Sequence, residues 1–127
     1  MRFTFPMAFL MLAASAGLAH ADLMSGEEIR DAVTGKRIYL ATPLGGEFPL
    51  YYQRSGTVDG SGEALGIGRW VRPTDSGRWW VDGDSLCQQW ETWYDGKRNC
   101  FKLQRVGENK LRWTRDDGYS GSARIGD

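Results

Sequence analysis

The spacing of apolar residues predicts one short helix near the start of the chain, followed by strands. Ile29, Ala32 and Val33 recur at the three- and four-residue spacing that places side chains on one helical face. The preceding Ser25-Gly26-Glu27-Glu28 matches a capping box, in which the serine hydroxyl and the last carboxylate each accept the other residue's backbone N–H. Gly35 suits the left-handed residue that ends a helix. A helix of at most about three turns is unstable alone in water, so we expect it to cover an open end of a sheet.

From Lys36 onward the apolar pattern changes to the two-residue alternation of β-strands. The predicted strands cover residues 38–41, 50–53, 65–71, 78–82, 86–91, 99–106, 110–114 and 119–125. Turn residues separate them, and Asp59-Gly60-Ser61-Gly62 is expected to be a flexible turn. About eight short strands joined by local turns predict an all-β fold, a small antiparallel meander barrel or sandwich with one short N-terminal helix.

The first 21 residues have the pattern of a signal peptide. Arg2 precedes an apolar stretch, and Ala19-His20-Ala21 places small residues where a signal peptidase cleaves. We expect residues 1–21 to be removed and residues 22–127 to form a single β domain. The protein is then periplasmic or secreted. The apolar stretch of about 17 residues, interrupted by Pro6, is short for a membrane span, so we expect no membrane anchor.

Cys87 and Cys100 are the only cysteines, and an exported chain favours a disulfide between them. A two-residue hairpin turn at Asp95-Gly96 would instead place Cys100 about 13 Å along the strand from the partner of Cys87, beyond disulfide reach. Both cannot hold. We therefore predict the disulfide, a longer or bulged connection between the two strands, and Leu86 near Phe101.

Charge and histidine content argue against several classes of function. The chain has 16 basic and 16 acidic residues, so no overall field attracts nucleic acid or an anionic membrane. The only histidine is His20, in the predicted signal peptide, which excludes histidine-dependent catalysis and histidine-ligated metals from the mature chain. We expect no enzyme activity, catalytic residue, metal or cofactor. The enzymatic alternative is a hydrolase that uses carboxylates, with Glu47, Glu63 and Glu91 as candidates.

Six tryptophans lie between residues 70 and 113. Trp79 and Trp113 alternate in phase with apolar neighbours and are expected in the core. Trp80 falls on the opposite face of its strand, and Trp93 lies in a loop. Exposed aromatic side chains among polar residues can stack on sugars, flat apolar ligands or a partner protein; alternatively they pack under the helix or across a barrel mouth. The predicted ligand-binding residues, an aromatic patch with a basic rim, are Trp80, Trp93, Tyr94, Arg78 and Arg98, with Lys97 as a further cation.

These features favour a monomeric, non-catalytic binding or accessory protein of the cell envelope. Its expected partner is a small apolar or sugar-like ligand, or another protein. The alternative is an inhibitor or interaction protein that inserts a loop into a partner enzyme, an idea that rests on analogy of fold alone.

The segment Gly77–Trp90 reads G-x-W-x-V-x-G-D-x-L-C-x-x-W, and a second cysteine follows at position 100. This pattern resembles a family of small secreted proteobacterial proteins of unknown function. Members tend to begin with a short helix of the L-x-G-x-E-I kind, which Leu23–Ile29 resembles. The similarity covers nearly the whole mature chain. It implies a periplasmic β domain and assigns no activity or site.

Overall fold

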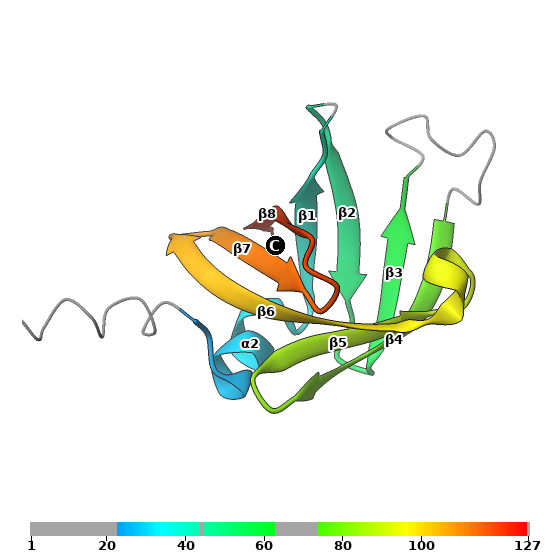
Figure 1. The fold of residues 1–127 in the computed structure, drawn as a ribbon, viewed down its shortest axis with the longest axis horizontal. Helices are drawn as coiled ribbons and strands as arrows, with labels where there is room; N and C mark the ends of the chain where they lie inside the picture. Colours follow the sequence, from blue (N-terminus) through cyan, green and yellow to red (C-terminus); the bar gives the residue numbers. More distant parts are fainter. Residues whose placement is uncertain (1–22, 44, 63–73, 127) are drawn as a thin grey trace, which may run out of the picture.

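The computed structural model describes residues 23–43, 45–62 and 74–126; the predicted signal peptide and the predicted strand at 65–71 lie outside them. In the described part, helix α2 (Gly26–Val33) precedes eight strands that form a closed antiparallel barrel in chain order (Figure 1). Strand β8 pairs with β1 and closes the sheet. The strands are β1 (Lys36–Ala41), β2 (Glu47–Tyr52), β3 (Thr57–Ser61), β4 (Thr74–Asp82), β5 (Ser85–Trp90), β6 (Arg98–Gly107), β7 (Lys110–Arg115) and β8 (Ser120–Ile125). The prediction of an all-β fold with one short helix is confirmed, and of the two expected architectures the structure shows the barrel.

The turn predicted at residues 59–62 is wrong, because Thr57–Ser61 forms strand β3 between β2 and β4. Gly60 lies in this strand with the ring of Trp93 directly over it. A Cβ at Gly60 would lie 2.6 Å from Cζ3 of Trp93. The glycine is therefore required by the close approach of an aromatic ring, a known reason for glycine within a strand.

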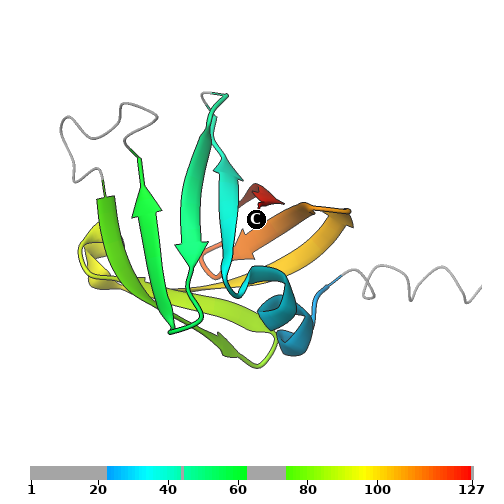
Figure 2. The ribbon, with the colours of Figure 1, turned by 180° about the vertical axis from the view of Figure 1, so that it is seen from behind.

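Helix α2 begins at the predicted capping box. The Glu28 amide donates to Ser25 Oγ at 3.2 Å, and the Ser25 amide donates to Glu28 Oε1 at 2.8 Å. The Gly26 amide also donates to Asp84 Oδ1 at 2.8 Å, which joins the helix to the β4–β5 turn. Gly35 follows the helix with a φ of +74°, as predicted. The helix lies across one end of the barrel (Figure 2). Its apolar residues Ile29, Ala32 and Val33 are buried, so the helix serves as the floor.

The two cysteines form the predicted disulfide. Cys87 and Cys100 are directly opposite each other on β5 and β6, and the neighbouring pair is Leu86 with Phe101. The connection between these strands contains a 3₁₀ turn, η3 (Trp93–Gly96). The prediction of a longer connection in place of a two-residue hairpin is therefore confirmed.

An up-and-down barrel has two distinct ends, because successive connections alternate between them. The helix and the β2–β3 and β4–β5 turns lie at the floor. The β1–β2 connection, η3 and the β7–β8 turn lie at the opposite end, which we call the mouth. Within the described residues, no helix has the length and apolar character needed to cross a bilayer.

Candidate functional site: a cavity inside the barrel

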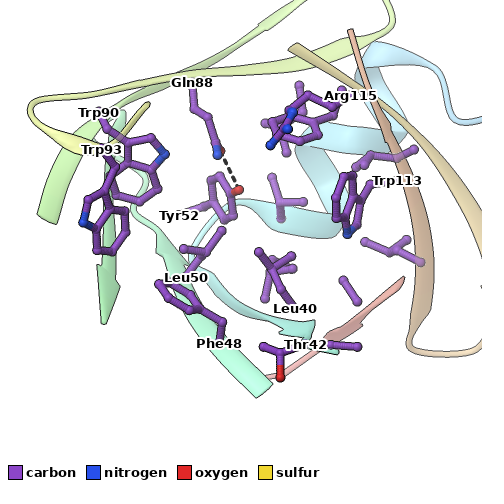
Figure 3. A pocket seen from close by; sticks show the side chains of 18 of the residues that line it. Leu40, Thr42, Phe48, Leu50, Tyr52, Gln88, Trp90, Trp93, Trp113 and Arg115 are labelled. Carbon is purple, nitrogen blue, oxygen red and sulfur yellow. Dashed lines mark hydrogen bonds between the residues drawn. The ribbon is translucent and has the colours of Figure 1, made fainter. Parts of the chain in front are cut away.

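The inward-facing side chains of the barrel leave a cavity of about 440 Å³. Eight strands make a barrel whose interior is either filled by side chains or holds one small ligand. Here the side chains surround the space without filling it (Figure 3). Most of the lining is apolar or aromatic: Val33, Ile38, Leu40, Ala41, Pro43, Phe48, Leu50, Leu86, Trp90, Trp93, Phe101, Leu103, Leu111, Trp113 and Ala123.

The cavity is closed at the floor and reaches the surface at the mouth. Val33 of helix α2 is fully buried and lines the floor end. At the mouth the lining includes Thr42, Tyr94 and Arg115. Tyr94 is 55% exposed and still lines the cavity, so in the described part of the chain the space communicates with solvent at this point.

Aromatic rings form two groups on opposite sides of the cavity (Figure 3). On one side Trp93 lies between Trp90 and Phe48, with ring centroids 4.7 Å and 5.4 Å away. On the other side Trp113 lies edge-on to Phe101 at 5.6 Å. Such rings supply large apolar surfaces with few rotatable bonds, which suits the binding of a flat apolar molecule.

The loop that carries Trp93 is fixed by hydrogen bonds from the barrel wall. Oδ2 of the buried Asp75 accepts from the backbone amides of Thr92 and Trp93, both at 2.8 Å. The Gln89 side chain donates from Nε2 to the Gly96 carbonyl at 2.9 Å. Tyr94 follows with a φ of +58°, a backbone conformation that costs energy in a non-glycine residue and persists where surrounding contacts impose it. The mouth is therefore preorganised on this side.

Deeper in the cavity, the polar groups mostly satisfy one another. The Tyr52 hydroxyl donates to Gln88 Oε1 at 2.7 Å. Burial, with a smaller effect of Tyr94, raises the pKa of the Tyr52 hydroxyl, so this group stays neutral and keeps its hydrogen bond at physiological pH. The indole Nε1 atoms of Trp90 and Trp113 are buried in the wall and have no hydrogen-bond partner in the described structure.

Arg115 is the charged residue among those that line the cavity. Its Nε donates to Asp117 Oδ1 at 2.8 Å. The guanidinium lies 5.2 Å from the ring centroid of Tyr94, whose side chain it also hydrogen-bonds, and 4.9 Å from that of Tyr119. Its side chain is only 14% exposed, so its charge is held in a largely desolvated position at the mouth.

The structure brings together two of the five predicted ligand-binding residues at the cavity, Trp93 and Tyr94. Arg78 and Trp80 form a separate pair on the outer face of β4, where the guanidinium lies 5.3 Å from the ring centroid. Trp80 points outward because its neighbour Val81 pairs with the inward-facing Leu86. Arg98 is exposed at the start of β6 and is not part of the lining.

Sequence reasoning missed Phe48, Trp90, Trp113 and Arg115 as lining residues of a cavity. The alternation of β7 carries the signal for two of them, because Leu111, Trp113 and Arg115 share the inward face. The sequence predicts only that Trp113 lies in the core with Leu111. Alternation shows which residues face inward and does not show how much space they leave.

No protein-family model, curated protein or solved structure matches this chain. The described residues also contain no group of three or more histidine, cysteine or carboxylate side chains placed to hold a metal ion. The interpretation of the site therefore depends on its geometry.

Proposed function

We propose that this protein is a non-catalytic binding protein that holds one small, mainly apolar ligand inside the barrel. The observation that carries the proposal is the apolar cavity of about 440 Å³, closed by α2 and open beside Tyr94. Small-molecule sites are typically concave, mostly apolar and of a few hundred Å³, with a few polar groups that fix orientation. At roughly 30 Å³ per atom, close to the volume of one water in the liquid, the space suits about 10 to 15 non-hydrogen atoms.

The fixed mouth supports the same proposal. Asp75 holds the backbone at Trp93, so the ring is in place before a ligand arrives. Binding then requires little ordering of the protein, which raises affinity for a given contact area. The Cys87–Cys100 disulfide favours an oxidising compartment, and we place the function in the periplasm or outside the cell.

Calorimetric titration with 2-naphthylmethanol, a flat neutral molecule of about 12 non-hydrogen atoms, tests the proposal. At roughly 0.5 kcal/mol per atom, within the range known for small ligands, we expect a Kd of some tens of micromolar. Burial of apolar surface also predicts a negative heat-capacity change.

A matched pair of variants on β8 locates the binding. Ala123→Phe adds a ring inside the cavity, because Ala123 is part of the lining. Ser122→Phe adds the same ring at the exposed neighbouring position. We expect the first variant to abolish binding and the second to leave it unchanged, with both variants folded by circular dichroism. Equal affinity in both variants would contradict the proposal.

A further inference from the structure

We infer that the ligand is an amphipathic acid, whose apolar body lies in the barrel and whose anionic group meets Arg115 at the mouth. This inference rests on the proposed function and adds the chemical class of the ligand. It depends on where the cavity carries charge and where it carries none.

The position of Arg115 assigns the charged end of the ligand to the mouth. Arg115 lies on β7 on the same inward face as Trp113 and Leu111, one step closer to the mouth. Its side chain is 14% exposed, so an ion pair formed there is less screened than one at the surface. Below it, Tyr52 and Gln88 are neutral and bonded to each other. An anionic group therefore has a charged partner at the mouth and none near the floor.

The guanidinium has donors left for such a group. Arginine presents five N–H donors in a planar fork that matches the two oxygens of a carboxylate. Asp117 takes the Nε–H, and the Tyr94 and Tyr119 rings flank the group. The terminal nitrogens carry four more N–H groups, of which one bonds the Tyr94 side chain and three are left for a ligand. Charge-assisted hydrogen bonds of this kind are the stronger class.

Two carboxylates near Arg115, those of Asp116 and Asp117, oppose the binding of an acidic ligand. Asp116 accepts from the Cys100 amide at 3.1 Å and is thereby held at the β6 strand. Asp117 bonds Arg115 directly, yet its side chain is 47% exposed, so it can turn toward water when a ligand arrives. Asp117 therefore acts as a competitor for the guanidinium. Its neutralisation is expected to strengthen the binding of an acid.

Titration with two probes of the same shape tests the inference: 2-naphthoate and its neutral counterpart 2-naphthylmethanol. We expect wild type to bind the acid about tenfold more tightly than the alcohol, the ratio that one favourable charge-assisted contact of about 1.4 kcal/mol gives. Arg115→Met keeps the apolar stem and is expected to remove the preference, because it weakens binding of the acid about tenfold more than binding of the alcohol. Asp117→Asn is expected to increase affinity for the acid alone.

The outcomes separate this inference from the function on which it rests. If wild type binds both probes equally, or if Arg115→Met weakens both by the same factor, the assignment of the acid is overturned and the binding function stands. If neither probe binds wild type, the proposed function fails as well. A salt series adds an independent readout, because added salt is expected to weaken acid binding and leave alcohol binding unchanged.

Discussion

A single methyl group at Gly60 is expected to displace the tryptophan that forms one side of the mouth. In Gly60→Ala, the new Cβ would lie 2.6 Å from Cζ3 and 2.9 Å from Cη2 of Trp93, with Leu50 Cδ2 at 3.0 Å. Real Cβ contacts are not this short, so the indole must shift. The loop resists, because Asp75 bonds the backbone of Trp93. Overpacking of this kind costs about 1–3 kcal/mol. Alanine also lowers the conformational entropy of the unfolded chain, which stabilises the folded state by about 0.4–1 kcal/mol.

We therefore expect Gly60→Ala to lower the free energy of unfolding by about 1–2 kcal/mol, measured by urea denaturation followed by circular dichroism. A double-mutant cycle isolates the cause. Trp93→Leu removes the ring atoms that the new methyl group meets. In that background Gly60→Ala is expected to be neutral or slightly stabilising, which gives a coupling free energy of about 1–3 kcal/mol. An equal loss of stability in both backgrounds would refute the reasoning, because the cost would then arise from the backbone of β3 rather than from Trp93.

Three further predictions concern the barrel wall. Asp75→Asn weakens a charge-assisted acceptor for two backbone amides, so we expect the free energy of unfolding in urea to fall by about 1–3 kcal/mol. Amide hydrogen exchange at residues 92 and 93 should also become faster. Unchanged exchange would contradict the role of Asp75 in fixing the backbone of this loop. Burial raises the pKa of the Tyr52 hydroxyl, so above the ordinary tyrosine pKa of about 10 the unfolded chain loses this proton while the folded chain keeps it. Stability should therefore fall as the pH rises, by up to about 1.4 kcal/mol per pH unit from this group, and Tyr52→Phe should show a shallower fall between pH 9 and 11; parallel profiles would refute the assignment. Removal of the disulfide in the double variant Cys87→Ala/Cys100→Ala should lower the free energy of unfolding by about 3 kcal/mol. A reductant should lower the urea midpoint of wild type and leave that of the double variant unchanged. A wild type that does not respond to the reductant would contradict the pairing.

The parts of the fold that were predictable from sequence depend on chemistry between near neighbours. The capping box needs only Ser25 and Glu28, three residues apart. The disulfide register agrees with the face pattern of two adjacent strands, and the presence of only two cysteines in a chain expected to be exported favours it over a two-residue turn. Closure of the barrel was left open between barrel and sandwich. It depends on β1 pairing with β8, between Ile38 and Ile125, and local patterns do not carry a pairing across that distance.

The features that the sequence does not reveal depend on residues that are distant from one another in the chain. Gly60 resembles a turn residue in its own sequence context, and the reason for it is the ring of Trp93, which is remote in the chain. Arg115 resembles an exposed residue at the end of a strand. Its place in the cavity follows from the register between β6 and β7, where it pairs with Phe101. Trp93 and Tyr94 were predicted because they are aromatic residues in a polar loop, a signal that local sequence does contain.

The central claim, that a small apolar molecule binds inside the barrel, is tested most directly by intermolecular nuclear Overhauser effects. The disulfide-bonded protein would carry ¹³C-labelled methyl groups and be saturated with 2-naphthylmethanol. Our account predicts contacts from the naphthyl protons to the methyl groups of Leu50, Leu111 and Ala123, which lie in the cavity wall and are buried. Contacts restricted to exposed methyl groups such as those of Val106, or no contacts at saturation, would contradict it.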